Sequence, residues 1–195
     1  MVIGGGKVAS RKVKTLLSYG AQVEVVSPEV VPELEDLARE GKIVLKKRPY
    51  QEGDLEGAFL VVAATNLPAV QEQVVGEAQK RGLLLNVVDQ PERSNFIVPS
   101  VVRRGRLTLA ISTSGASPAL ARRLRETLED IFGPEYATYL DLMARWREEI
   151  LARELKEEER RQIFEHLALL PIPRWLKRGE WAQLEAVART FKLSL

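Results

Sequence analysis

The sequence predicts an α/β fold with a Rossmann-type parallel sheet, followed by a small α+β region and a helical tail. Two β-branched residues, Val2 and Ile3, run directly into the pattern Gly4-x-Gly6-x-x-Ala9, and a helical pattern follows at once. Strand-like apolar runs then alternate with helical patterns as far as Asp89, which is the order of a doubly wound sheet. Beyond that point the rhythm changes and the chain becomes almost entirely helical in pattern.

The glycine segment predicts a dinucleotide site, because each small residue has a mechanical task. Gly4 lets the chain turn sharply off the strand, and Gly6 leaves room for backbone N–H groups to approach a pyrophosphate. Ala9 allows the helix to pack tightly on the sheet. The phosphates are expected at the positive end of the helix dipole, where Lys7 and Val8 also lie. We therefore assign Gly4, Gly6, Lys7, Val8 and Ala9 to cofactor binding.

Composition excludes several classes of protein. The 195 residues allow one domain of average size and a smaller appendage, and a net charge of +2 is too small to indicate nucleic acid or membrane as a partner. Cysteine is absent, which excludes disulfides, thiolate metal sites and cysteine nucleophiles. Neither a spanning apolar run nor a secretory signal is visible. These features predict a soluble, cytoplasmic protein.

The elements of the first half follow from periodicity and from glycine punctuation. Helices are expected at 7–19, 31–40 and 68–81, and strands at 22–26, 43–45, 58–64 and 83–88. Gly20 and Gly82 are expected to end helices as C-caps. The first strand is short, so either it is truly short or the natural start of the protein lies upstream. The predicted inward stripe of the first helix consists of Val8, Val13, Leu16 and Leu17.

Two strand ends are expected to contact the cofactor. The acid that holds the ribose normally ends the second strand, where Ser27, Pro28 and Glu29 stand in this chain. No arginine follows directly, which favours NAD over NADP. Thr65 and Asn66 end the buried fourth strand at the carboxyl edge, where ligands bind in sheets of this kind.

The second half begins with two strand-like runs at 96–102 and 107–111, which could form an antiparallel hairpin or add to the edge of the sheet. Ser117 is a good N-cap and Pro118 suits the first turn of the helix that follows. Breaks are expected at 133–134 and 171–173, where proline interrupts the helical pattern. The predicted division is an NAD-binding domain over 1–98, a dimerisation and substrate region over 99–132, and a helical region over 133–195.

Five motifs together resemble the precorrin-2 dehydrogenase family, whose module also forms the N-terminal part of multifunctional sirohaem synthase. The Asn-Val-Val-Asp and Ser-Thr-Ser-Gly-x-Ser-Pro segments make the resemblance specific, because a glycine fingerprint alone occurs in many families. The motifs stand in the family's order at Gly4–Lys12, Ala63–Asn66, Asn86–Asp89, Asn95–Ser100 and Ser112–Arg122.

The resemblance implies NAD-dependent oxidation of precorrin-2, a tetrapyrrole, to sirohydrochlorin. It also implies a homodimer in which a small α+β dimerisation domain packs against its partner. Because nothing follows Leu195, a stand-alone dehydrogenase is expected. One alternative is a bifunctional enzyme that also inserts ferrous iron, and another is a non-catalytic NAD-sensing module.

Asp89 is the expected catalytic residue, because it ends the fifth strand and matches the family's essential aspartate. A carboxylate at that place can accept the proton that must leave with the hydride. The alternative for Asp89 is an ordinary turn-capping role in Asp-Gln-Pro. Thr113, Ser114 and Arg122 are the expected substrate contacts, through a helix N-terminus and an arginine fork that suits carboxylates.

Other conspicuous side chains have structural explanations. His166 is the only histidine, so a packing or surface role is favoured and no metal site is expected. Trp146, Trp175 and Trp181 are expected to be packing anchors, at the dimer interface or within the tail. Each remaining arginine is singly more compatible with a solvated surface charge, although one or two are expected to reach the substrate; these are Arg103, Arg104, Arg106, Arg123 and Arg125.

Overall fold

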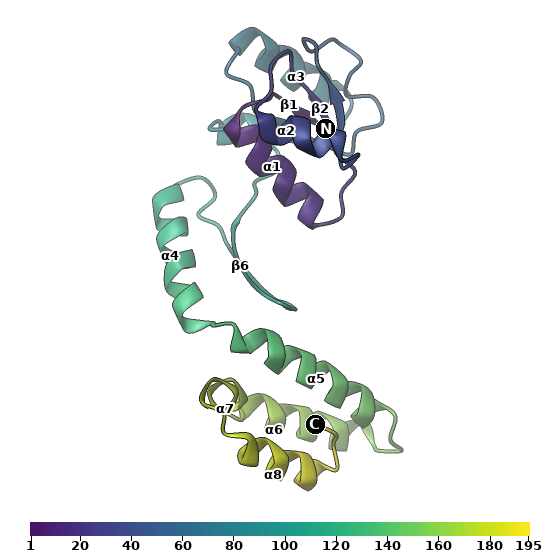
Figure 1. Cartoon of the computed structure of the whole chain (residues 1–195), viewed down its shortest axis with the longest axis vertical. Helices are drawn as coiled ribbons and strands as arrows, with labels where there is room; N and C mark the ends of the chain where they lie inside the picture. The colour runs from purple at the N-terminus through teal and green to yellow at the C-terminus, as the bar shows by residue number, and fades with distance from the viewer. The chain divides into compact units, whose positions relative to one another are not determined.

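The computed structural model describes the whole chain, residues 1–195, as two compact units (Figure 1). The first unit is Met1–Val98 and the second is Pro99–Leu195. The further division of the second unit at residue 133 stays a prediction.

The first unit contains a parallel sheet of five strands in the order β3-β2-β1-β4-β5. The chain moves outward from the central β1 to one side and then returns to the other, so the sheet has its switch point between β1 and β4. Ile3 at the end of β1 is level with Val26 of β2 and Ala63 of β4. The strands are β1 (Val2–Ile3), β2 (Glu24–Val26), β3 (Val44–Lys46), β4 (Leu60–Ala63) and β5 (Leu84–Val87).

Helices cover both faces of this sheet, as the alternating pattern predicted (Figure 1). On one face, α1 (Lys7–Ser18) and α2 (Pro32–Arg39) pack on a core that includes Val25 and Val62. On the other face, α3 (Pro68–Lys80) packs on Val61 and its neighbours. Successive residues of β4 therefore enter opposite cores, which explains why that strand is apolar at every position.

One detail of α1 was predicted wrongly. Val8 was assigned to the inward stripe, but it is 38% exposed. The neighbouring small residues Ala9 and Ser10 are buried instead, while Val13 of the predicted stripe is buried as expected. The small side chains of the first turn contact the sheet. The buried face of the helix therefore differs from the face that the large apolar residues alone predict. Gly20 and Gly82 end their helices with positive φ, as expected.

The second unit begins with an antiparallel hairpin of β6 (Ser100–Arg104) and β7 (Leu107–Ile111). This settles the two alternatives in favour of a separate two-stranded sheet.

The free edge of β5 in the first unit is covered by side chains from the segment around the short helix η1 (Pro91–Arg93). The Asn95 Oδ1 accepts a hydrogen bond from Leu85 N at 2.6 Å and the Ser94 Oγ accepts one from Val87 N at 2.9 Å, so these edge groups are already satisfied.

The rest of the second unit is helical. The breaks before Glu135 and Ile172 fall at the predicted proline segments, whereas those at 152–156 and 179–180 were not predicted. Ser117 caps the first of these helices by accepting from Leu120 N at 3.3 Å. No helix of the chain is both long enough and apolar enough to cross a bilayer. The helices are α4 (Pro118–Ile131), α5 (Glu135–Leu151), α6 (Glu157–Leu169), α7 (Ile172–Arg178) and α8 (Trp181–Phe191).

The last four helices share one apolar core, and Figure 1 shows them gathered at the C-terminal end of the chain. Trp146 is fully buried in that core and donates its Nε1–H to Ser194 O at 2.6 Å. His166 is exposed and its ring contacts that of Phe191, with 5.4 Å between ring centroids, which agrees with the predicted packing or surface role. Trp181 is 58% exposed, so the prediction that it anchors packing is wrong within this chain.

Candidate cofactor and catalytic site

Gly4 occupies a position that no other residue fits. Its φ is +122°, a region that side chains rarely adopt, and its N–H donates to Val26 O at 2.9 Å. A Cβ at this position would lie 2.3 Å from the carbonyl oxygen of Ala64. The close approach lets the chain leave β1 between β2 and β4, at the switch point of the sheet.

Gly6 fits the pyrophosphate of a dinucleotide for a different reason. It has ordinary extended backbone at the N-cap of α1, and a Cβ there would have no atom within 4 Å. The helix start carries no side-chain cap and no acidic residue in its first turn, and the N–H groups of Lys7, Val8 and Ala9 have no acceptor within the chain. Open space and free N–H groups at the positive end of a helix form an anion site.

The corner after β2 contains the predicted ribose contacts. Ser27 is 8% exposed, and its hydroxyl donates to the carbonyl oxygen of Glu29 at 2.6 Å. Val31 N donates to Gly5 O at 2.8 Å, which ties this corner to the glycine loop. Pro28 and Glu29 are exposed. The Ser27 hydroxyl therefore stabilises its own turn, and Glu29 is the acid available at this corner.

Thr65 and Asn66 follow β4 on the same edge of the sheet. The Thr65 Oγ1 accepts from Leu67 N at 3.2 Å, and the Thr65 carbonyl oxygen accepts from a buried glutamine of α3. Asn66 is exposed and its side chain makes no hydrogen bond within the chain. Asn66 is thus free to contact a ligand, while Thr65 shapes the loop.

Asp89 lies in the turn after β5, with its side chain exposed and its φ at +60°. This left-handed conformation is uncommon for a residue other than glycine, and asparagine and aspartate tolerate it best. The turn is held by its neighbours: Val88 N donates to Ala63 O at 3.0 Å, and the Ser94 Oγ donates to Gln90 O at 3.0 Å. The carboxylate therefore stands at the edge where β1, β2 and β4 also end.

Lys12 lies close to Asp89 and Asn86, and the sequence did not single it out as a candidate site residue. Its Nζ donates to the Asn86 Oδ1 at 3.5 Å, and the Asn86 amide donates in turn to Phe96 O at 3.0 Å. Burial lowers the pKa of Lys12, as does the neighbouring Arg11, while the carboxylate of Asp89 acts in the opposite direction. The available signal was spacing, because Lys12 follows the buried Ala9 by three positions and shares its helix face.

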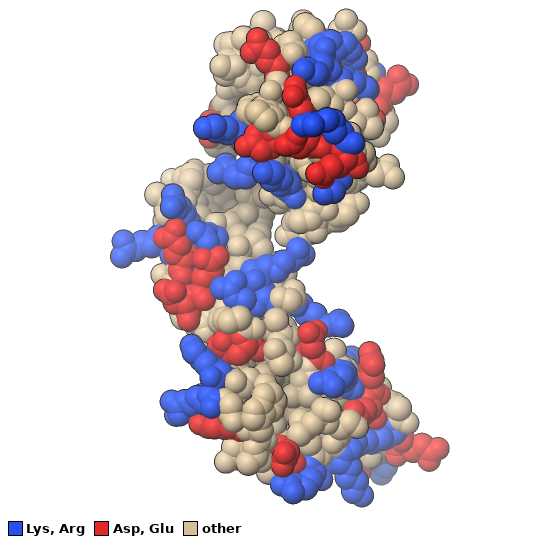
Figure 2. All heavy atoms as spheres, in the orientation of Figure 1, with Lys and Arg blue, Asp and Glu red and all other residues tan.

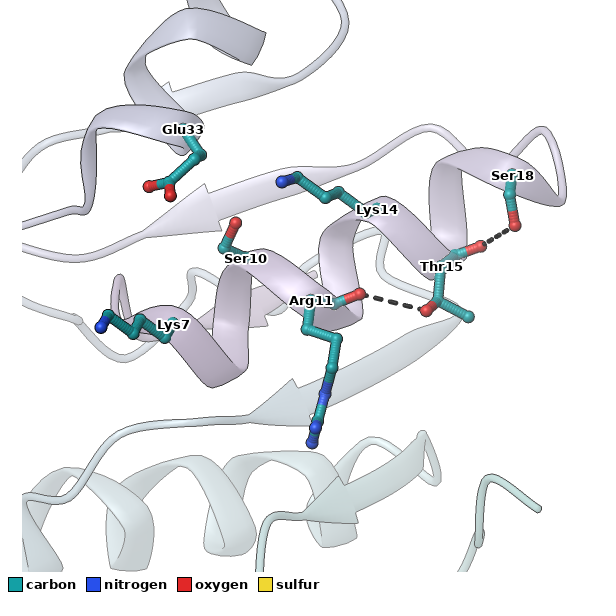
Figure 3. A pocket seen from close by; sticks show the side chains of 7 residues that line it. All are labelled: Lys7, Ser10, Arg11, Lys14, Thr15, Ser18 and Glu33. Carbon is teal, nitrogen blue, oxygen red and sulfur yellow. Dashed lines mark hydrogen bonds between the residues drawn. The ribbon is translucent and has the colours of Figure 1, made fainter. Parts of the chain in front are cut away.

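A polar hollow runs along α1 in the first unit, with a volume of ≈ 550 Å³ (Figure 3). It adjoins the helix start through Lys7. Two of its hydroxyls are occupied, since the Thr15 Oγ1 donates to Arg11 O and the Ser18 Oγ to Thr15 O. The lining residues are Lys7, Ser10, Arg11, Lys14, Thr15, Ser18 and Glu33.

The predicted substrate contacts Thr113, Ser114 and Arg122 lie in the second unit. The Thr113 Oγ1 accepts from Ser117 N at 3.1 Å, so it helps to build the turn before α4. Ser114 is exposed with a φ of +51°. Arg122 pairs with Glu126 at 2.9 Å on the exposed side of α4. Their role toward a substrate stays a prediction.

Several other arginines are already engaged. Arg104 donates to Phe132 O at 2.8 Å and to Glu129 O at 3.3 Å, so it caps the end of α4 rather than standing free for substrate. Arg106 pairs with Asp141 and Arg125 pairs with Glu129. Figure 2 accordingly shows acidic and basic side chains interspersed along α4. No cluster of three or more His, Cys, Asp or Glu side chains is placed to hold a metal ion.

Comparison with known proteins places this site in a family. A family described as putative NAD(P)-binding matches residues 1–100, and one described as sirohaem biosynthesis protein, central, matches residues 104–131. The solved structure of SirC, a precorrin-2 dehydrogenase, superposes with a TM-score of 0.75 at 30% identity over 91% of both chains. The chain belongs to the precorrin-2 dehydrogenase and sirohaem synthase family.

Curated members of this family resemble the chain over most of its length. The sirohaem synthase of Pseudomonas entomophila is 40% identical over 185 residues, which is 95% of this chain and 40% of that protein. The sirohaem synthase of Methylobacillus flagellatus is 42% identical over 165 residues, which is 85% of this chain and 35% of that protein. The chain thus spans about two fifths of the length of the sirohaem synthases that it matches.

Proposed function

We propose that this chain is an NAD-dependent dehydrogenase that oxidises precorrin-2 to sirohydrochlorin on the route to sirohaem. The observation that carries the proposal is Asp89, whose exposed carboxylate is held in a left-handed turn at the same sheet edge as the glycine loop. The names of the relatives, sirohaem synthase and precorrin-2 dehydrogenase, support this substrate. The NAD-sensing alternative requires the glycine loop but has no use for Asp89.

The reaction removes two hydrogens from the tetrapyrrole, one as a hydride and one as a proton. NAD, when bound, supplies the hydride acceptor. The uncapped start of α1 would hold the pyrophosphate through backbone N–H groups, and Glu29 would bind the ribose hydroxyls. The Asp89 carboxylate accepts the proton from the carbon framework and releases it to solvent after product leaves.

Lys12 acts beside Asp89 as the fixed positive charge of the site. Its half-buried ammonium is hydrogen-bonded to Asn86, which keeps it on the side of α1 that faces the end of β5. A tetrapyrrole of this type carries several carboxylates, and an incompletely hydrated ammonium attracts them more strongly than one in open water. We assign Lys12 to substrate binding in the first unit. Thr113, Ser114 and Arg122 stay separate proposed substrate contacts of the second unit.

We also propose that the working form is a cytoplasmic homodimer. The support is an apolar stripe on α4, where Leu120, Leu124 and Ile131 are 48%, 41% and 57% exposed. These residues recur at helical spacing and lie on one side of the helix. The hairpin β6–β7 has only two strands, and such a sheet gains stability from further packing. Leu124→Glu should convert the dimer to a monomer in sedimentation velocity runs.

The test is an anaerobic incubation of the protein with precorrin-2 and NAD, followed by optical spectroscopy. We expect the sirohydrochlorin spectrum from the wild type and at least a hundredfold slower appearance with Asp89→Asn, the general range for a missing proton acceptor being about 10²–10⁴-fold. NAD titration should give the same Kd for both proteins. Unchanged precorrin-2 with intact NAD binding would favour the sensing module.

Ferrous iron is added in a second stage of the same experiment. Formation of sirohaem faster than in a protein-free control would establish the bifunctional alternative, in which Asp89 also accepts pyrrole protons as the metal enters. Formation at the control rate would leave the dehydrogenase as the single activity.

A further inference from the structure

We propose that Gln71 is a positioning residue that holds the loop after β4 and the turn of Asp89 in a fixed relation. The inference rests on the proposed function, in which the first of these segments contacts the cofactor and the second accepts the proton. No motif of the sequence singled out Gln71, and it lies outside the glycine loop and the strand ends.

The geometry consists of two hydrogen bonds from one buried amide. Gln71 is 8% exposed and lies in the first turns of α3. Its Nε2 donates to Thr65 O at 2.7 Å, and its Oε1 accepts from the Gln90 Nε2 at 3.0 Å. One side chain therefore joins the residue before Asn66 to the residue after Asp89.

The other end of the Gln90 side-chain amide is also hydrogen-bonded. The Gln90 Oε1 accepts from the Arg93 Nη1 at 3.2 Å, and Arg93 forms an ion pair with Glu72. Glu72 follows Gln71 directly on α3. Both ends of this series of contacts therefore lie on the same helix. The turn is thus fastened to α3 at two consecutive positions.

Asp89 needs such support because its conformation is not self-sustaining. A left-handed backbone at a residue other than glycine is strained, less so for aspartate than for most residues, and it persists where the surroundings impose it. A proton acceptor also loses much of its rate advantage when it is displaced by about 1 Å. The orientation of the Gln71 amide is fixed, because its Nε2 donates to a carbonyl oxygen and its Oε1 accepts from an amide donor.

Two substitutions cut the two bonds separately. Gln71→Glu replaces the donor to Thr65 O by an oxygen and leaves an acceptor for Gln90. Gln90→Glu removes the donor to Gln71 and leaves an acceptor for Arg93. The matched control is Gln73→Glu, which makes the same chemical change on the same helix at an exposed side chain without a hydrogen bond.

We expect the two variants to affect different constants. Gln71→Glu should raise the Kd and KM for NAD by about tenfold, the size of the effect of losing one buried neutral hydrogen bond. Gln90→Glu should lower kcat by about tenfold with the Kd for NAD within twofold of wild type, because it loosens only the Asp89 turn. Gln73→Glu should change neither. Thermal melts of all three establish the folded fraction in each assay.

A second measurement uses no turnover, so it separates this inference from the proposed function. ADP-ribose, which lacks the nicotinamide ring, is added and hydrogen exchange is followed in the peptide spanning 87–95. We expect slower exchange in the wild type and in Gln73→Glu, and no slowing in Gln71→Leu at saturating ligand.

The outcomes are distinct. Wild-type protein without turnover but with the expected exchange pattern would refute the proposed function and leave the linkage standing. Equal slowing of exchange in Gln71→Leu, or variants that lower only the melting temperature with kcat and Kd unchanged, would overturn the positioning role and leave Gln71 as an ordinary buried amide.

Discussion

Replacement of Gly6 by alanine separates cofactor binding from folding. The added methyl group would meet no protein atom within 4 Å, and the φ of −80° at Gly6 is open to alanine. The same methyl group projects into the space above the uncapped start of α1, where the pyrophosphate is expected. The variant should therefore fold normally and bind NAD poorly.

The expected changes in stability and in NAD affinity can be estimated separately. Glycine is a better N-cap than alanine, so the exchange should cost about 1 kcal/mol at most, which is a few degrees in melting temperature. One displaced hydrogen bond from a backbone N–H to a phosphate is worth about 1.5–3 kcal/mol, which corresponds to roughly a 10- to 150-fold rise in Kd. The effect on binding should thus exceed the effect on stability.

The assay is a titration with NAD by calorimetry, beside thermal melts of the free protein. The matched control is Gly76→Ala in the interior of α3, where a methyl group also meets nothing within 4 Å. That control should gain roughly 0.5–1 kcal/mol of stability and bind NAD as the wild type does. A wild-type Kd in the Gly6→Ala protein would refute the assignment of the pyrophosphate to this helix start.

Three further substitutions test the framework around the site. Gly4→Ala should destabilise the first unit by at least about 2 kcal/mol, because its Cβ would lie 2.3 Å from the backbone oxygen of Ala64; urea unfolding measures this, and a loss below 0.5 kcal/mol would contradict it. Glu77→Gln should destabilise the protein by about 1–3 kcal/mol at pH 7. Although burial favours the neutral acid, hydrogen bonds from Tyr50, Gly53 and Arg81 lower the pKa of Glu77 below 4.5, so the wild-type advantage is full above that pH and shrinks as the pH falls through the folded-state pKa. A gap in unfolding free energy that widens between pH 7 and pH 3.5 would show the sign to be wrong. Trp146→Phe should cost about 2–3 kcal/mol through the lost bond to Ser194 O and the vacated volume, with NAD affinity unchanged; a shifted Kd for NAD would show that the tail influences the cofactor site.

Sequence reasoning identified the order of elements because the signals for them are local. Glycines with positive φ stand where helices end, and the predicted helix at 68–81 corresponds to α3. The glycine loop could also be recognised from the sequence, since Gly4 adopts a backbone conformation that other residues avoid and Gly6 stands directly before the helix. The prediction was wrong for Val8 because it considered only large apolar side chains. The small residues beside Val8 are buried in its place.

Contacts between distant segments were not predictable in the same way. The Lys12 ammonium and the Asn86 amide are 74 residues apart in the chain, and only the strand order brings β5 to the side on which α1 presents that lysine. Gln71 joins two loops that are neighbours only because β4 and β5 pair. Arg104 was singly predicted to be a solvated surface charge, whereas its hydrogen bonds go to the end of α4.

The sequence by itself therefore determined that a strand, a glycine turn and a helix would follow one another, with an aspartate further along the same sheet edge. The tertiary structure decided which polar side chains surround that aspartate and whether 96–111 would join the sheet or form a hairpin. The physical reason is the range of the forces involved: backbone conformation and helix polarity act over a few residues, whereas the partner of a buried amide or ammonium is set by pairing between strands far apart in the chain.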